Sequence, residues 1–181
     1  MRCSWTDLKD KDYIHYHDCE WGVPVHDDRR LFEMLILEGF QAGLSWQCVL
    51  HKRENFKKAF DNFDVEKIAN YHDKKCNQLM HDEGLIRHRL KINAAVKNAK
   101  SFLKIQQEFD SFDKYIWGWT KGKIITADGT QTRSELSDKI SKDLKKRGMG
   151  FVGTTIVYAY LCAIGVINAH EKNCDFRKEI K

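Results

Sequence analysis

The chain has 181 residues and a net charge of +5, from 31 Lys and Arg against 26 Asp and Glu. With 42% hydrophobic and 12% aromatic residues it can bury a core without disulfides, which excludes a disordered chain. No apolar run reaches membrane-spanning length, and six cysteines without a secretory leader indicate reduced thiols. We therefore expect one domain over residues 1–181 in the cytoplasm, without a membrane partner. The charge permits a nucleic-acid partner without requiring one.

The first half of the chain predicts helices from its caps and its apolar spacing. Asp27 or Asp28 can cap a helix over residues 29–38, which is apolar on nearly every face and should be the buried central helix. Ser45 can cap the next helix. The apolar stripe of that helix consists of Trp46, Val49, Leu50, Phe56 and Phe60.

The middle of the chain continues the helical pattern. Asp64 begins a short helix through Ile68 and Ala69, and another short helix ends near Met80. A long amphipathic helix is expected from about Arg89. Its apolar positions are Leu90, Ala94, Val96, Ala99, Phe102 and Leu103.

The last third adds a further amphipathic helix and the remaining irregular structure. Ser134 can open that helix, which carries Leu136, Ile140 and Leu144, and Gly148 can end it. Residues 118–133 form the one long loop candidate, and within it only residues 123–125 are strand-like. Residues 154–167 are predicted to form a buried helix. The pattern predicts an all-α fold with a single compact helical domain.

A histidine and a cysteine near the C-terminus have the spacing of metal ligands. His170 and Cys174 would share one helical face, but two ligands do not hold a zinc ion. Cys3 and His17 are natural partners, which would give a closed Cys2His2 site. His15, Cys19 and His26 are rival ligands, and on spacing alone four unrelated residues remain the simpler interpretation.

The segment Asp82–Asn93, "DEGLIRHRLKIN", has the outline of a helix-hairpin-helix motif. A glycine and two apolar residues lie between helices and lead into a basic turn, where backbone N–H groups and cations can bind a phosphate. The usual second glycine is replaced within residues 87–89, so an ordinary helical corner is an equal alternative. The basic clusters at 97–104 and 142–147 are less distinctive, and the former reads as a solvated helix face.

One carboxylate stands out from its surroundings. Glu38 ends a helix that is apolar almost all round, where a charge is costly unless it is solvated or hydrogen-bonded. This favours a functional Glu38. Trp21 and Trp46, taken singly, are more commonly core residues, because aromatic side chains dominate cores.

Several long segments together resemble the 3-methyladenine DNA glycosylase I family. The resemblance runs from Cys3 to Cys174, nearly the whole chain. The segments that carry it are "YHDCEWGVP" (16–24), "LFEMLILEGFQAGLSW" (31–46), "HKREN" (51–55), "LIRHRLKI" (85–92) and "KKRGMGFVGTTIVYAYLCAIGVINAH" (145–170).

The resemblance implies a monomeric helix-hairpin-helix glycosylase that flips 3-methyladenine out of double-stranded DNA and hydrolyses its glycosidic bond, with free 3-methyladenine as a product. It implies one structural zinc per chain on Cys3, His17, His170 and Cys174, joining the two ends of the chain. The implied catalytic and base-binding residues are Glu38, Tyr16 and Trp46, with Tyr13 and Trp21 close by. The implied DNA-binding residues are Gln41, Gly43 and Leu44 in a loop that enters the duplex, and Arg87, Arg89 and Lys91 at phosphates.

The superfamily's usual catalytic aspartate has no clear counterpart. The neighbourhood past the hairpin offers Glu108, Asp110 and Asp113, and the family that the chain resembles lacks this aspartate. No lysine suggests strand cleavage, so we expect a monofunctional enzyme that leaves an abasic site. A catalytically inactive DNA-binding module and a zinc-dependent hydrolase remain alternatives, although a hydrolase needs an open metal position and no His-Glu-x-x-His signature is present.

Overall fold

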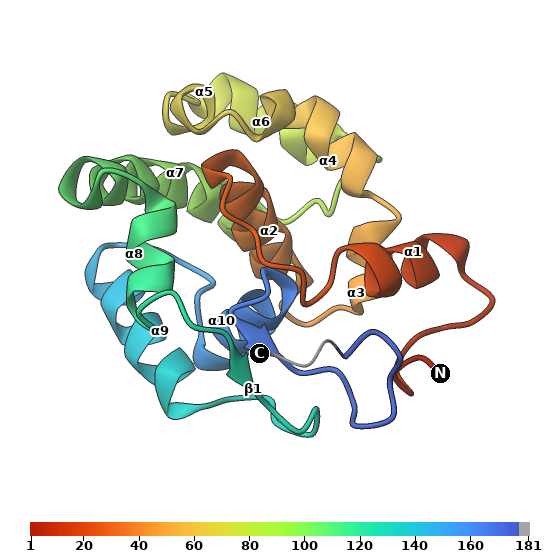
Figure 1. The fold of residues 1–181 in the computed structure, drawn as a ribbon. Coiled ribbons are helices and arrows are strands. Elements are labelled where there is room, and N and C mark those ends of the chain that lie inside the picture. The colour runs from red at the N-terminus through yellow and green to blue at the C-terminus, as the bar shows by residue number, and fades with distance from the viewer. Residues whose placement is uncertain (178–181) are drawn as a thin grey trace.

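The computed structural model describes residues 1–177 and is mostly helical (Figure 1). The helices in chain order are α1 (Lys11–Cys19), α2 (Asp28–Gln41), α3 (Trp46–Leu50), α4 (Arg53–Ala59), the 3-10 turn η1 (Asp61–Phe63), α5 (Val65–Ala69), α6 (Asp73–His81), α7 (Arg89–Phe109), α8 (Phe112–Gly118), α9 (Glu135–Lys146) and α10 (Thr154–Ala163). The strands are β1 (Ile125–Thr126) and β2 (Ile167–Asn168). Helices α1 and α8 and strand β2 were not predicted from the sequence.

Helix α2 is the centre of the single hydrophobic core, as predicted. Every residue from Leu31 to Phe40 is buried, and α3, α7, α8 and α10 all contact this helix (Figure 1). The Asp27 side chain accepts a hydrogen bond from the Arg30 N–H at 2.9 Å, which caps the helix. A helix that is apolar all round is stable only when other helices surround it.

The single helix expected after Ser45 is two helices. Ser45 does cap α3, but His51 and Lys52 form a turn that separates α3 from α4. The apolar stripe from Trp46 to Phe60 is buried nonetheless. The break turns α4 so that Phe56 packs edge-on against Phe40 at 4.7 Å, which one straight stripe does not reveal.

Two further expectations differ from the structure. Leu90 lies in the predicted stripe of α7 but is 65% exposed, because it shares the solvent-facing side of the helix with the exposed Lys97. The helix expected over 154–167 ends at Ala163. Gly165 adopts a φ of +77°, and a side chain there would meet the backbone of Val23 at 2.5 Å. Strand β2 then pairs in parallel with β1 inside the predicted loop.

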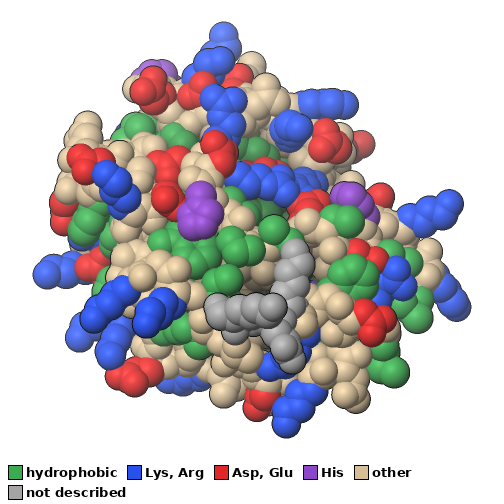
Figure 2. Space-filling model, in the orientation of Figure 1, with side chains coloured by type: hydrophobic (Ala, Val, Ile, Leu, Met, Phe, Trp, Pro, Cys, Tyr) green, Lys and Arg blue, Asp and Glu red, His purple; other side chains and the backbone are tan. Residues whose placement is uncertain are grey.

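The two ends of the chain lie side by side. The Asp175 N–H donates to the Met1 carbonyl at 2.8 Å, and Figure 1 shows the C-terminal segment beside the N-terminal loop. On the face drawn in Figure 2, acidic and basic side chains are interspersed around apolar areas. Within residues 1–177, no helix combines the length and apolarity needed to cross a membrane.

Candidate active site

A cavity of about 130 Å³ with mostly aromatic walls lies beside α1, α2 and α3. The rings of Tyr16 and Trp46 lie 5.1 Å apart and inclined at 42° to each other. Residues of the sequence-predicted site line it together: Tyr13, Tyr16, Trp21, Glu38, Gln41 and Trp46, joined by Trp5 and Ala159. A flat ligand can therefore contact aromatic rings from several elements.

Glu38 brings an unpaired carboxyl group to this cavity from the last turns of α2. The side chain is 3% exposed, and its Oε2 atom has no hydrogen-bond partner among the described residues. Burial raises the pKa of Glu38 to about 8, so the carboxyl is largely protonated at neutral pH. The indole N–H of Trp46 is also buried without a partner. Buried unpaired polar groups beside a cavity are typical of ligand sites.

Asp10, which was not predicted as a site residue, fixes α1 against α3. Its Oδ1 accepts from the Tyr13 N–H at 3.2 Å and caps α1, while its Oδ2 lies 2.7 Å from Gln47 Nε2 and 2.6 Å from His51 Nε2. One carboxylate thus joins the helix that carries Tyr16 to the helix that carries Trp46. An aspartate before a helix signals a cap, but its bonds to α3 depend on tertiary packing.

Trp5 lines the cavity but was not among the residues predicted from the sequence. Its ring lies 4.8 Å from that of Trp21 and 5.5 Å from that of Tyr13, so it supports both. A lone tryptophan near the N-terminus carries no periodic signal. Only the position of the N-terminal segment brings it here.

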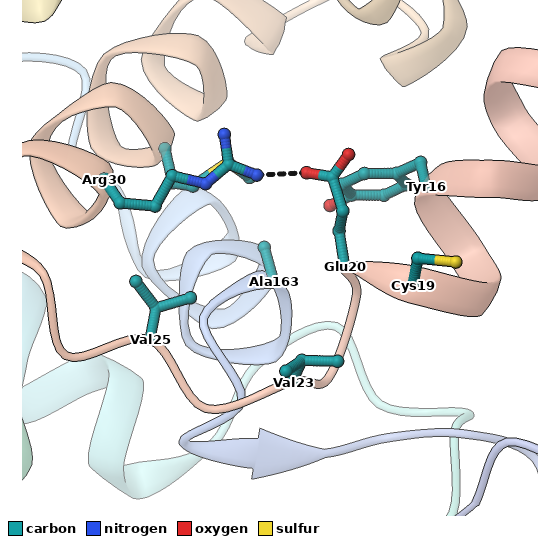
Figure 3. A pocket seen from close by; sticks show the side chains of 8 residues that line it. Tyr16, Cys19, Glu20, Val23, Val25, Arg30 and Ala163 are labelled. Carbon is teal, nitrogen blue, oxygen red and sulfur yellow. Dashed lines mark hydrogen bonds and ion pairs between the residues drawn. The ribbon is translucent and has the colours of Figure 1, made fainter.

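A second cavity of about 180 Å³ also borders Tyr16 but contains paired charges (Figure 3). Glu20 forms an ion pair with Arg30 and a second one with Arg53 at 2.8 Å. Arg53 also contacts Glu33 at 2.7 Å. Because these groups neutralise one another, this cavity lacks the unpaired carboxyl group that distinguishes the Glu38 cavity.

Cys3, His17, His170 and Cys174 form a buried cluster whose ligand atoms lie within 4.8 Å of one another. Cys3 Sγ is 3.5 Å from His170 Nδ1, and Cys174 Sγ is 3.5 Å from His17 Nε2. Sulfur and nitrogen ligands of one tetrahedral zinc ion lie about 3.5 Å apart, so the separations fit a metal ion. Four protein ligands would leave no open position.

The surroundings of the cluster also fit a metal site. His17 Nδ1 lies 2.7 Å from Asp18 Oδ1, and Arg2 in turn holds this carboxylate. His170 Nε2 lies 3.2 Å from the carbonyl oxygen of Trp21. Such outer partners orient the imidazoles of metal ligands. Burial lowers the pKa of His170 to about 4, which keeps the ring in its neutral, metal-binding form.

The rival ligands lie elsewhere. His15 and Cys19 are exposed, and His26 Nδ1 lies 2.7 Å from Asp113. The expectation that His170 and Cys174 share a helical face is wrong, since residues 169–177 contain turns and no helix. Turns bring the two side chains together, with Cys174 Sγ 3.4 Å from His170 Nδ1.

The metal-ligand cluster lies directly behind the aromatic cavity. The Trp21 ring is 4.6 Å from the His170 ring, and the Trp5 ring is 5.2 Å from the His17 ring. His17 and Tyr16 are adjacent in α1. The residues that fix the chain ends therefore also support one wall of the cavity.

The segment between α6 and α7 forms a tight turn with exposed arginines. A side chain on Gly84 would meet Asn55 at 3.1 Å, and the Gly84 N–H donates to Asp82 Oδ1 at 2.8 Å. Leu85 is buried beneath the turn, and Arg87 and Arg89 extend into solvent. Both arginines are accessible to an anionic partner.

The prediction that Lys91 contacts a phosphate requires correction. Its side chain is only 6% exposed, and its ammonium donates to the carbonyls of Phe40 at 2.7 Å and Ala42 at 2.6 Å. Lys91 is the third residue of α7, where the helix turns this position toward α2. Its ammonium group is therefore hydrogen-bonded inside the protein and does not face a phosphate.

The predicted DNA-entering loop is an exposed turn beside the cavity. Leu44 is 42% exposed, and its N–H donates to the Gln41 carbonyl at 2.7 Å. Gly43 adopts a φ of +81°, which explains why a glycine occupies this position. Gln41 also lines the cavity, so the turn and the cavity are continuous.

The acidic residues past the hairpin do not reach the cavity. Glu108 pairs with Arg147 at 2.6 Å, and Asp113 lies beside His26. Asp110 ends α7 in a left-handed conformation and pairs with Lys114. None of the three lines the cavity.

Comparison with known proteins gives matches along nearly the whole chain. The family model for methyladenine glycosylase matches residues 5–178. DNA-3-methyladenine glycosylase 1 of Escherichia coli (strain K12) is 44% identical over 178 residues, covering 96% of this chain and 95% of that protein. DNA-3-methyladenine glycosylase of Haemophilus influenzae is 43% identical, covering 96% of each.

Solved structures agree with the sequence matches. A crystal structure of 3-methyladenine DNA glycosylase I superposes with a TM-score of 0.93 at 44% identity, covering 97% of this chain and 98% of that one. A Staphylococcus aureus structure described as the structural basis of 3-methyladenine recognition gives a TM-score of 0.95 at 35% identity, covering 99% and 98%. On this evidence the chain belongs to the methyladenine glycosylase family.

Proposed function

We propose that this protein is a monofunctional DNA glycosylase that excises 3-methyladenine from alkylated double-stranded DNA and leaves an abasic site. The observation that carries the proposal is Glu38, a buried carboxyl with an unpaired oxygen, in a cavity whose walls include Tyr16 and Trp46. Membership of the methyladenine glycosylase family supports the same conclusion.

The chemistry of the lesion explains why such a site suffices. Alkylation at N3 gives adenine a formal positive charge, so the glycosidic bond is labile and the base departs neutral with little acid catalysis. The protein must mainly flip and hold the base while water attacks the sugar. Tyr16 and Trp46 would attract the cation by stacking and cation–π contact. The positive charge of the base would lower the pKa of Glu38, so that its carboxyl ionises and accepts a hydrogen bond from the base edge. Tyr13 and Trp21 would complete the walls.

The DNA would be held by the elements around the cavity. We propose that α6, the turn at 82–88 and α7 act as a helix-hairpin-helix motif, with Arg87 and Arg89 at phosphates. Gln41, Gly43 and Leu44 would enter the duplex and fill the gap left by the flipped base. The exposed position of Leu44 beside the cavity supports this assignment.

The buried cluster of Cys3, His17, His170 and Cys174 would hold one structural zinc ion per chain. The zinc ion would join the two ends of the domain, which we take as residues 1–181. All chemistry at the base would come from residues other than the zinc ligands. The buried set of two thiols and two imidazoles supports zinc. A closed set of four ligands argues against a zinc-dependent hydrolase, which needs an open position.

We place the enzyme in the cytoplasm as a monomer. All six cysteines are free of disulfides, which fits a reducing compartment. The partners would be alkylated DNA and the released 3-methyladenine.

The test is chromatography of the bases released from methylated duplex DNA. The proposal predicts 3-methyladenine in the supernatant and an abasic strand that stays intact until treated with alkali. DNA binding without any released base would instead identify an inactive binding module. Immediate loss of activity with a chelator, before unfolding, would identify a metal-dependent hydrolase.

A further inference from the structure

Lys91 is a buried cation held by carbonyl groups rather than by a carboxylate. Its ammonium donates to the carbonyls of Phe40 and Ala42 and lies 5.8 Å from the centre of the Phe151 ring. No ion pair joins it to an acidic group among residues 1–177. Burying an unpaired ammonium is costly, so its persistence here calls for an explanation beyond surface charge.

One carbonyl acceptor, that of Ala42, belongs to the turn that follows α2, and the other, that of Phe40, lies in the last turn of α2. Residues 41–44 form a reverse turn closed by the hydrogen bond from the Leu44 N–H to the Gln41 carbonyl. Ala42 has φ −46° and ψ 113°, and Gly43 has φ +81°, which are the values of a type II turn. A side chain on Gly43 would meet nothing within 4 Å, so its backbone conformation is the reason for glycine.

The hydrogen bond to the Ala42 carbonyl selects the form of this turn. Type I and type II turns differ mainly in the orientation of the central peptide, which here joins Ala42 to Gly43. The Ala42 carbonyl belongs to that peptide. Because Lys91 Nζ lies 2.6 Å from its oxygen, a flip to type I would break a charge-assisted hydrogen bond and leave the ammonium less satisfied. The second bond, to Phe40, fixes the end of α2 against α7.

We propose that Lys91 is a positioning residue that locks the Ala42–Gly43 peptide and so presents Leu44 to the gap in the duplex. This inference rests on the proposed function of the turn. Lys91 follows Arg89 by two residues in the same first turn of α7. The element proposed to contact phosphates would therefore also hold the gap-filling turn, so that phosphate contact and gap filling share one rigid support.

The experiment compares binding to two duplexes that differ only in a gap. One is undamaged and the other carries a tetrahydrofuran abasic analogue opposite the same base. Lys91→Met removes the ammonium and keeps a long apolar side chain. Lys97→Met makes the same change at an exposed position of the same helix and is the matched control. Gly43→Ala disfavours the type II turn by its φ alone.

The expected result is a loss of preference for the gap. Lys91→Met should reduce the ratio of affinities for abasic over intact duplex by about tenfold, as should Gly43→Ala, and the double variant should lose little more. Lys97→Met should leave the ratio unchanged. Binding of free 3-methyladenine, followed by tryptophan fluorescence, should be retained in all variants, because none of these residues lines the Glu38 cavity.

Other results would overturn the inference. An equal loss of affinity for both duplexes would make Lys91 a general electrostatic contact. Loss of binding to free 3-methyladenine in Lys91→Met would mean that Lys91 is needed for the folded structure as a whole. A wild-type protein without any preference for the gap would refute gap filling by this turn. Failure of the proposed function is read separately, as absence of 3-methyladenine release from methylated DNA by the wild-type protein.

Discussion

At the scale of single residues, the decisive feature is a carboxyl group that lacks a partner inside the protein. Glu38 is buried without an opposing charge, and its Oε2 has no hydrogen-bond partner among the described residues. A group in this state gains more from a ligand that donates a hydrogen bond or carries positive charge than a solvated carboxylate would. Selectivity should therefore depend on this residue.

Glu38→Gln should reduce discrimination between methylated purines. Both 3-methyladenine and 7-methylguanine are cationic in DNA, so stacking on Trp46 and Tyr16 cannot separate them strongly. The positive charge of a bound base favours the ionised form of Glu38. The adenine amino group donates to that carboxylate, whereas the guanine carbonyl opposes it with lone pairs. We expect wild-type protein to release 3-methyladenine with little 7-methylguanine. In the wild type, a polar group left unpaired by 7-methylguanine supports discrimination between the two bases of about 1–3 kcal/mol. In the variant, the glutamine amide can turn a donor toward the guanine carbonyl, which reduces this discrimination.

The measurement is chromatography of both bases from the same methylated DNA. The variant should release 3-methyladenine more slowly and narrow the ratio between the two rates. An equal proportional loss of both activities would mean that Glu38 acts in catalysis or folding rather than in reading the base.

The pKa of Glu38 also predicts how stability depends on pH. Burial raises it from an ordinary 4.5 to about 8, so between these values the native state holds a proton that the unfolded chain releases. The contribution of the protonated carboxyl is therefore full at low pH and is lost as pH rises toward 8, with a slope of at most about 1.4 kcal/mol per pH unit.

Urea unfolding over this pH range tests the sign. Glu38→Gln cannot ionise, so its free energy of unfolding minus that of the wild type should increase as pH rises. The metal ligands titrate in both proteins and cancel in the difference. A constant difference would mean that Glu38 keeps its ordinary pKa in the folded protein.

At the scale of elements, α1, α2 and α3 carry most of the residues that line the cavity, and the α6–α7 turn carries the arginines proposed to contact DNA. Asp10 ties α1 to α3, so the Tyr16 and Trp46 rings are held in register from two helices. The α6–α7 turn keeps Arg87 and Arg89 in solvent, whereas the next basic residue, Lys91, turns inward. Neighbouring positive charges therefore have different surroundings.

The exposed arginines should govern the salt dependence of DNA binding. Replacing Arg87 or Arg89 by alanine should weaken binding to all duplexes alike and reduce the slope of log affinity against log salt by about one unit, because one phosphate contact is lost. Lys104→Ala, an exposed lysine later in α7, is the control and should leave the slope unchanged. Fluorescence anisotropy at several salt concentrations measures the slope. An unchanged slope in both arginine variants would mean that Arg87 and Arg89 belong to a solvated surface and do not contact phosphates.

At the scale of the whole molecule, the two ends of the chain complete one wall of the cavity. Ligands from both ends meet in the buried metal-ligand cluster, and Trp5 and Trp21 lie between it and the cavity. Contacts between residues more than 150 positions apart cost considerable chain entropy. A bound metal ion would offset that cost by holding four side chains at once.

Cys174→Ala should therefore lose zinc and stability together. We expect the purified protein to contain one zinc per chain, and the variant to lose it with about 3–5 kcal/mol of unfolding free energy. Cys19→Ala replaces an exposed thiol near the same region and should keep both. Metal analysis and thermal unfolding provide the readouts. Full zinc content in Cys174→Ala would exclude this residue as a ligand.

The sequence by itself determined the features that depend on local chemistry. The caps at Asp27, Ser45, Asp64 and Ser134 were predicted because a side chain that caps a helix bonds to N–H groups two or three residues away. The all-helical class and the buried α2 followed from apolar spacing. The residues that line the Glu38 cavity were predicted from family resemblance, because no local sequence pattern places α1 beside α3.

The tertiary structure alone decided features that depend on long-range packing. It broke the stripe after Ser45 into α3 and α4, exposed Leu90, and paired β1 with the unpredicted β2. It brought Trp5 to the cavity and buried Lys91 against the carbonyls that end α2. Burial and hydrogen-bond partners across a fold depend on which segments meet, and apolar periodicity specifies the face of each helix without specifying its neighbour.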